Sequence, residues 1–278
     1  MNLLGIDFED WYHLELVQRH IKTQNNKPTV INGIDKILEW LRKNDTVATF
    51  FTVGELLEFR PELLDKILGG GHEIGFHTMH HTRLDSQNFK EKFSEEVKKF
   101  HAMTGGRSRG FRAPSFSLND SSSWAIDVLA ENNYQYDSSI VPAKTRLYGV
   151  PDAEIKPYRI TGKEIRKNDS NGKMWEFPLL TTKFLGKTIP ACGGFYIRFL
   201  PLNVIENAIS KNSDMNIPSS FYIHSWELTP EFMPRVPLSI VESFITYYNL
   251  GKTMARLDKI IKKFKFTSFE KFLSGTSI

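Results

Sequence analysis

The sequence predicts a barrel-like α/β fold with about seven parallel strands. Segments with the composition of buried strands alternate with segments of helical periodicity along most of the 278 residues, and this alternation is typical of parallel βα units. A chain of this length accommodates one large domain, and 40% hydrophobic residues suffice for a sizeable core. Functional side chains in such folds gather after the carboxyl ends of strands, so reactive residues should follow the predicted strands.

The predicted strands are short runs rich in apolar, β-branched and aromatic residues. In chain order they are residues 2–8, 47–53, 72–77, a strand that begins near 109 and runs into a loop, 174–180 and 219–227. The predicted helices show apolar residues at helical spacing and polar or glycine ends. They cover residues 31–44 with Asn32 as N-cap, 60–71, 88–105, 121–134, about 202–212 and about 237–265.

The remaining organisation follows from composition. Residues 144–175 are polar and irregular and are expected to form a surface excursion, and the whole chain, 1–278, is expected to be one catalytic domain with a helical extension over about 237–278. The single cysteine, Cys192, excludes an internal disulfide framework and is interpreted as a small packing residue.

Charge and hydropathy argue against two partners, nucleic acid and a membrane. The net charge is only +4, and the most basic stretch, residues 259–266, is interpreted as a solvated helix face and not as a nucleic-acid arm. The first residues lack the basic start of a signal peptide, and no run of about 18 apolar residues predicts a membrane span. The expected compartment is therefore the cytoplasm.

Histidines are concentrated in GHEIGFHTMHHTRL, residues 71–84, which hold four of the eight in the chain. His77 and His81 follow a predicted strand and are four positions apart, a spacing that lets two imidazoles reach one metal ion. His80 would point elsewhere, and His72 lies at the far end of the strand. A catalytic site requires a third protein ligand and an open position for water.

The acidic stretch DFED, residues 7–10, follows the first strand and offers that ligand. Asp7 and Glu9 share one face while the chain stays extended, and Asp10 joins them if the chain turns after residue 9. One carboxylate can bind the metal while a second serves as a general base. A solvated acidic loop is the alternative, but it fits poorly between LLGI and WY.

Two further strand ends contribute reactive groups. Arg112, in FRAPSF, can hold a carboxylate through two parallel hydrogen bonds. His224 ends FYIH and, at the same rim, is a candidate acid catalyst. The alternative for Arg112 is a surface salt bridge. His224, taken alone, would be interpreted as a satisfied structural histidine, and its place at the same rim as the other groups favours the acid catalyst.

Together, DFED, HTMHH, RAPSF and IHSW resemble, in order, the motifs of the polysaccharide deacetylases, the family-four carbohydrate esterases with a NodB-homology domain. RAPSF matches the family's Arg-x-Pro-x-Phe motif at every fixed position. The resemblance extends from residue 3 to about residue 230. YDSSI, EFPL and GGFYIRFLP further resemble a branch linked to bacterial surface polysaccharide synthesis.

The resemblance implies a distorted (β/α) barrel of seven strands, a divalent metal that is usually zinc, and removal of an acetyl group, mostly N-acetyl, from a sugar. It assigns Asp7 as general base, His77 and His81 as metal ligands, Arg112 as the arginine that orients the base, and His224 as general acid. The family's paired aspartates are replaced here by Asp7-Phe8-Glu9-Asp10. The metal carboxylate is therefore Asp10, favoured for its short side chain at a turn, or Glu9.

Aromatic residues beside these groups are expected to contact the sugar. They are Trp11, Tyr12 and Trp226, with Pro114 and Phe116 of RAPSF. Two other functions share the pattern: a catalytically silent carbohydrate-binding module, and an amidohydrolase or deformylase acting on a small non-sugar amide.

Overall fold

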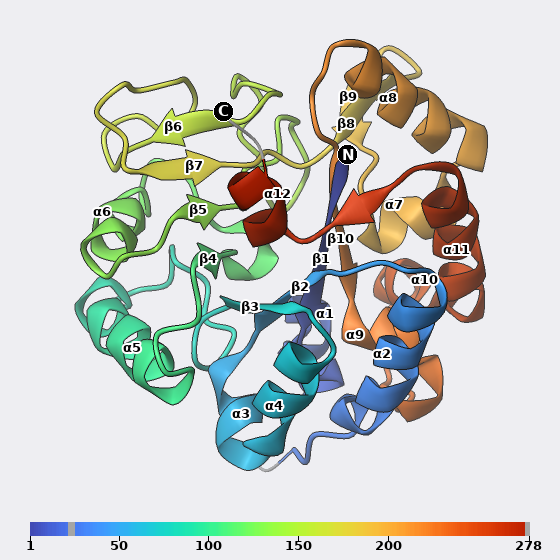
Figure 1. Cartoon of the computed structure of the whole chain (residues 1–278). Coiled ribbons are helices and arrows are strands. Elements are labelled where there is room, and N and C mark those ends of the chain that lie inside the picture. Colours follow the sequence, from blue (N-terminus) through green and yellow to red (C-terminus); the bar gives the residue numbers. More distant parts are fainter. Residues whose placement is uncertain (22–25, 276–278) are drawn as a thin grey trace.

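One curled sheet of nine strands forms the centre of the computed structural model, which describes residues 1–21 and 26–275 (Figure 1). The main path of the sheet runs β10 (Ser220–His224), β1 (Asn2–Phe8), β2 (Thr49–Thr52), β3 (Glu73–Phe76), β4 (Gly110–Phe111), β5 (Tyr136–Asp137), β7 (Met174–Glu176) and β6 (Tyr158–Ile160). The short β11 (Phe266–Thr267) pairs with β1. Every pairing in this sheet is parallel except β6 with β7.

The barrel is distorted because regular strands do not close it. Two isolated parallel bridges, Leu179 with Ser220 and Gly193 with Tyr222, join the chain after β7 to β10. Gly193 has φ +146°, and a Cβ there would lie 1.5 Å from the Tyr222 carbonyl oxygen, so only glycine permits this close approach. The predicted distorted (β/α) barrel is confirmed.

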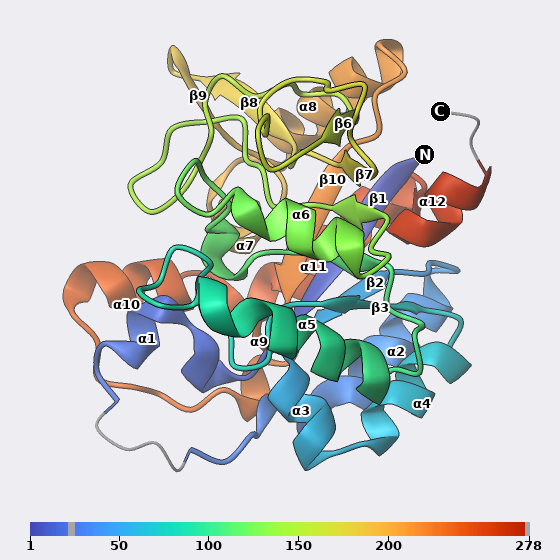
Figure 2. The same cartoon turned by 90° about the vertical axis from the view of Figure 1, so that its left-hand side faces the viewer.

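Helices cover the sheet. Figure 1 places α5 and α6 beside β4 and β5, and Figure 2 shows these two helices next to each other. In chain order the helices are α1 (Glu15–Gln18), α2 (Ile34–Lys43), α3 (Gly54–Phe59), α4 (Glu62–Gly69), α5 (Lys90–Met103), α6 (Trp124–Glu131), α7 (Gly194–Phe199), α8 (Leu202–Asp214), α9 (Ser225–Leu228), α10 (Ile240–Tyr247), α11 (Thr253–Lys263) and α12 (Phe269–Gly275). Each longer helix buries one apolar stripe; α2, for example, buries Ile34, Ile37, Trp40 and Leu41. No described helix has both the length and the apolar character that crossing a bilayer requires.

Several local features predicted from the sequence were wrong. Asn32 does not cap α2, because a 3₁₀ turn (Val30–Gly33) precedes that helix and Gly33 occupies the cap position. Residues 144–175 contain the strand β6, and a hairpin of β8 (Thr181–Phe184) and β9 (Lys187–Pro190) was not predicted. The single long helix expected over about 237–265 is two helices, α10 and α11, separated by a turn at Asn249, which has φ +51°.

The C-terminal extension is helical except for β11, and its last residues, 276–278, lie outside the described part of the chain. Its α12 packs under the amino ends of the strands. There the Phe269 ring contacts Phe51 and Tyr136, with ring centroids 5.6 and 5.3 Å apart. This aromatic cluster fills the end of the barrel at which the strands begin.

A buried carboxyl group, Glu73 at the start of β3, fastens α12 to this cluster. It accepts hydrogen bonds from the Thr49 and Tyr136 hydroxyls and from the backbone N–H of Glu270, the last at 3.0 Å. Burial raises the pKa of Glu73 to about 7, although the three hydrogen bonds oppose the shift.

Replacing Glu73 with glutamine is expected to change how stability depends on pH. The carboxyl pKa is higher in the folded state than in the unfolded chain, so wild-type stability is greatest below the unfolded value near 4.5 and falls as the pH rises toward 7. The slope is at most about 1.4 kcal/mol per pH unit. In urea unfolding at pH 5, 6 and 7, the free energy of unfolding of Glu73→Gln should rise relative to that of wild type as the pH rises. Glu131→Gln, at an exposed position of α6, should show no such trend. A constant difference would contradict titration of Glu73.

Candidate active site

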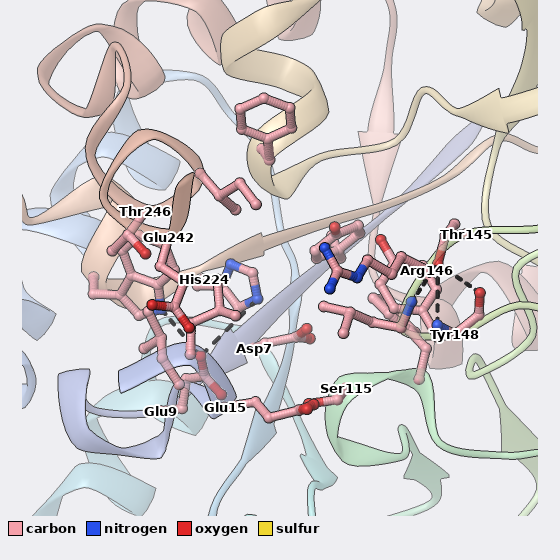
Figure 3. Close-up of a pocket in the computed structure, with 18 of the residues that line it drawn as sticks. Asp7, Glu9, Glu15, Ser115, Thr145, Arg146, Tyr148, His224, Glu242 and Thr246 are labelled. Carbon is pink, nitrogen blue, oxygen red and sulfur yellow. Dashed lines mark hydrogen bonds and ion pairs between the residues drawn. The ribbon is translucent and has the colours of Figure 1, made fainter. Parts of the chain in front are cut away.

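A pocket of 520 Å³ opens at the carboxyl ends of the central strands (Figure 3). Its inner wall carries Asp7, Glu9, His77, His81 and His224. Asp7 and His224 are direct partners in the parallel register of β1 and β10, and His77 immediately follows β3. Strands from both halves of the chain therefore bring these side chains to one rim, as expected for this class of fold.

Glu9, His77 and His81 form the group of potential metal ligands within the described residues. One ligand atom from each lies within 4.8 Å of the others, and all three residues are buried. The loop that returns His81 to His77 has left-handed backbone at Thr78 and His81, with φ +58° and +55°. Strained backbone of this kind persists where surrounding structure enforces it.

The orientation of each potential ligand is fixed by a second contact. His77 Nδ1 donates to the Arg112 carbonyl oxygen at 2.7 Å, which leaves Nε2 as the nitrogen with a free lone pair. Burial lowers the pKa of His77 to about 4, so its imidazole is neutral at pH 7. Glu9 accepts from Trp226 Nε1 at 3.0 Å, and its other oxygen lies 2.6 Å from His81 Nε2.

The other candidate carboxylate, Asp10, lies outside this group and has a different task. Its oxygens accept hydrogen bonds from the backbone N–H groups of Trp11 at 2.9 Å, Val30 at 2.8 Å and Ile31 at 3.3 Å. Asp10 therefore caps the 3₁₀ turn of residues 11–13 and anchors the chain at residue 30. This corrects the preference for Asp10 over Glu9 as the metal carboxylate.

Asp7 and Arg112 form a buried ion pair beside the ligand group. Arg112 Nη1 donates to Asp7 Oδ1 at 2.7 Å, while Nε and Nη2 donate to the Ser138 carbonyl and hydroxyl at 2.9 and 3.0 Å. The guanidinium carbon lies 4.1 Å from the Phe51 ring centroid. Gly5 provides the space, since a Cβ there would lie 2.4 Å from Arg112 Nη1.

His224 is held by an acidic partner in the first turn of α9. Its Nδ1 lies 2.7 Å from Glu227 Oε2, and its Nε2 lies 4.0 Å from Glu9 Oε1. The Trp226 ring stacks on the imidazole with centroids 5.0 Å apart. Burial opposes the charged imidazolium, but the Glu227 carboxylate outweighs this effect and raises the pKa of His224 to about 9.

Glu227 is itself buried and paired with a buried arginine. Arg198 Nε donates to Glu227 Oε1 at 2.7 Å, and the rest of its guanidinium donates to the carbonyls of Ile245, Thr246 and Tyr248. One ion pair thus connects the imidazole of β10 to the end of α10, whose residues Glu242 and Thr246 also line the pocket.

Replacing Glu227 with glutamine is expected to destabilise the fold and slow any reaction that uses His224 as an acid. Removing the charge of one partner leaves Arg198 charged and buried, and breaking such a pair costs about 3–5 kcal/mol. The imidazolium also loses its counter-charge. Urea unfolding and turnover of the same preparation measure the two effects, and unchanged stability would contradict the role assigned to the pair.

The expected sugar-contacting residues divide into two groups. Phe116 and Trp226 line the pocket, whereas Trp11, Tyr12 and Pro114 are not among its lining residues. The 3₁₀ turn capped by Asp10 directs the two N-terminal aromatics elsewhere, and the Tyr12 hydroxyl donates to Glu55 at 2.8 Å. The structure therefore places Phe116 and Trp226 at the pocket and leaves Trp11, Tyr12 and Pro114 outside its lining.

Sequence reasoning missed Glu227, Arg198 and the pocket residues Arg146 and Tyr148. The sequence could have predicted the contact between His224 and Glu227, because an acidic residue three positions after the last residue of a strand fits a capping box. Arg198 had none, since its partner lies 29 positions away in the sequence. Arg146 and Tyr148 belong to a segment expected to lie on the surface.

Two family models match consecutive parts of the chain. One, described as "Polysaccharide deacetylase", matches residues 27–136, and the other, described as "Domain of unknown function (DUF3473)", matches residues 138–274. Among curated relatives, a peptidoglycan-N-acetylglucosamine deacetylase of Bacillus cereus is 35% identical over 88 residues, which are 31% of this chain and 41% of the relative. The chain therefore spans less than half of that relative's length.

Solved structures share the fold at low sequence identity. A protein of Mycobacterium smegmatis assigned to the polysaccharide deacetylases superposes with a TM-score of 0.58 at 13% identity and covers 99% of this chain and 90% of its own. A CE4 family pseudoenzyme from Bacillus anthracis gives 0.51 at 13% identity, with 98% and 65% covered. Because the fold is common to both, only the side chains of the site can distinguish an active enzyme from a silent relative.

Proposed function

We propose that this chain, whose residues 27–136 match the polysaccharide deacetylase model, is a metal-dependent hydrolase that removes an acetyl group, an N-acetyl in particular, from a sugar of a bacterial polysaccharide or its precursor. One observation carries the proposal. A three-residue ligand group, a carboxylate held by arginine and a histidine held by glutamate share one pocket.

The donor set suits a divalent metal, and zinc is the expected one. Two imidazoles and one carboxylate are ligands that Zn²⁺ accepts, and three protein ligands leave a position open for water or substrate. Glu9, His77 and His81 would hold the ion. When bound, it would polarise the acetyl carbonyl and lower the pKa of water at the site.

Asp7 is the proposed general base. Its carboxylate points into the pocket (Figure 3), and Arg112 fixes its orientation from below through a hydrogen bond to Oδ1. Arg112 donates to Oδ1 and not to Oδ2, so Oδ2 can accept the proton of the attacking water. A positioned base of this kind contributes about 10²–10⁴-fold to a rate.

His224 is the proposed general acid. Glu227 occupies Nδ1, so the protonated Nε2 faces the pocket and can donate to the departing sugar nitrogen. The donation is necessary because an amine leaves poorly as an anion. The raised pKa keeps the imidazole protonated at pH 7, before the proton is needed.

The test is acetate release from N-acetylated oligosaccharides with and without a chelator. The proposed function predicts release that a chelator abolishes and Zn²⁺ restores. Formate release, or hydrolysis of small ureido compounds in place of acetylated sugars, would indicate an amidohydrolase or deformylase. Sugar binding without any hydrolysis would indicate a silent carbohydrate-binding module.

A further inference from the structure

We infer that the pocket recognises a substrate with an anionic group, a carboxylate or a phosphate ester, close to the acetylated position, and that Arg146 binds this group. The inference rests on the proposed function of the pocket and names the class of sugar it accepts. It starts from the charge balance of the pocket wall.

Every carboxylate and guanidinium among the residues that line the pocket, except one, lies within 4 Å of an oppositely charged side chain or a histidine of the described chain. The pairs are Asp7 with Arg112, Glu9 with His81, Glu15 with Arg19, Arg198 with Glu227, and Glu242 with His20. The remaining charged wall residue is Arg146, whose guanidinium has no carboxylate partner among residues 1–21 and 26–275. This arginine therefore adds an uncompensated positive charge to the wall.

Arg146 occupies the corner of a tightly bonded turn. The Thr145 hydroxyl donates to the Tyr148 carbonyl at 2.6 Å and accepts from the N–H groups of Leu147 and Tyr148 at 3.2 and 3.0 Å. Gly149 follows with φ +124°, where a Cβ would lie 1.9 Å from the Ala143 carbonyl oxygen. The backbone that presents the guanidinium is thus defined by hydrogen bonds and close packing.

The turn is also anchored to the strand that carries His224. The Tyr148 ring packs on Phe116 with centroids 5.1 Å apart, and Phe116 packs on Tyr222 at 4.8 Å. Tyr222 precedes His224 by two positions in β10. Figure 3 shows the Arg146 side chain extending from the turn toward the space above Asp7. Its base is therefore fixed relative to the proposed catalytic groups.

A guanidinium in this position discriminates by charge. It can bind a carboxylate or phosphate through two parallel hydrogen bonds, and each charge-assisted bond is stronger than one to a sugar hydroxyl. A neutral sugar offers no such partner. When a neutral sugar binds, the arginine stays solvated and adds no ionic interaction to the binding free energy.

Three matched substrates test the inference. Each is an N-acetylglucosamine disaccharide with the same linkage, and the second sugar is glucose, glucuronic acid or glucose 6-phosphate. Wild type is expected to show a kcat/KM about ten-fold or more higher for the acidic sugars than for the neutral one, the factor that one charge-assisted hydrogen bond provides. The preferred acid identifies the natural anion as carboxylate or phosphate.

Arg146→Gln is expected to remove the preference, so that kcat/KM for the two acidic disaccharides falls to about that for the neutral one. Arg146→Lys should keep part of it, because a point charge remains without the planar fork. Lys144→Gln, a charge-matched change on an exposed neighbour outside the pocket lining, should keep all of it. An equal preference in wild type and Arg146→Gln, or a wild type that favours the neutral sugar, would overturn the inference while the deacetylase function stands.

Equilibrium binding separates this result from failure of the proposed function. If no disaccharide releases acetate, the deacetylase proposal fails. Calorimetric titration with the glucuronic acid disaccharide then still tests the anion site, because wild type should bind it about ten-fold more tightly than Arg146→Gln does. Equal affinities would exclude the site.

Discussion

Replacing His77 with alanine is expected to remove the bound metal and to lower turnover by about a thousand-fold or more. The change leaves two of the three ligands, and two ligands do not hold a catalytic ion. Losing several kcal/mol of carbonyl polarisation corresponds to a factor of that size. Elemental analysis of dialysed protein, together with acetate release, measures both consequences.

The matched control is His80→Ala. His80 lies in the same loop, but it is exposed and its Nδ1 contacts Glu55 Oε2 at 2.8 Å, away from the ligand group. This variant should keep its metal and its rate. Full metal content in His77→Ala would show that the ligand assignment is wrong.

Replacing Asp7 with asparagine is expected to lower turnover by about 10²–10⁴-fold while the metal stays bound. The amide keeps the shape of the carboxylate but cannot accept the proton of the attacking water, and a base of this kind accounts for that factor. Asp7 is not a member of the ligand group, so the ion should remain.

This result is read from kcat and metal content measured on one preparation. Asp35→Asn, an exposed aspartate of α2 that pairs with Lys66, is the control for a change of charge alone. A wild-type rate in Asp7→Asn would require another residue to act as the base. Loss of the metal in Asp7→Asn would instead make Asp7 a ligand.

The sequence predicts the architecture well because the signal is strong where strands are fully buried. Residues 2–8 form β1 as predicted, and every residue of that strand is buried, so its run of apolar residues has one explanation. The rule that reactive groups follow strands in a parallel sheet then brought Asp7, His77, Arg112 and His224 to one rim. This prediction requires only the parallel order of the strands and no knowledge of side-chain packing.

The sequence does not decide which carboxylate faces the histidines. Glu9 and Asp10 are adjacent, and their roles depend on where the chain turns. The turn is set by two backbone N–H groups, of Val30 and Ile31, that bond to Asp10 from 20 and 21 positions along the chain. The same limit applies to Arg198 and Glu227, because no local pattern announces an ion pair formed between two distant helices.

The aromatic cluster at the end of the barrel at which the strands begin links catalysis to the order of synthesis. The Phe269 ring centroid lies 5.7 Å from the Arg112 guanidinium carbon, and the Phe51 ring packs against both, 4.1 Å from that carbon and 5.6 Å from the Phe269 ring. Although Asp7 and Arg112 are made early, the floor beneath them is completed only by a residue near the far end of the chain. A nascent polypeptide on the ribosome therefore cannot assemble the finished site until residue 269 has left the exit tunnel.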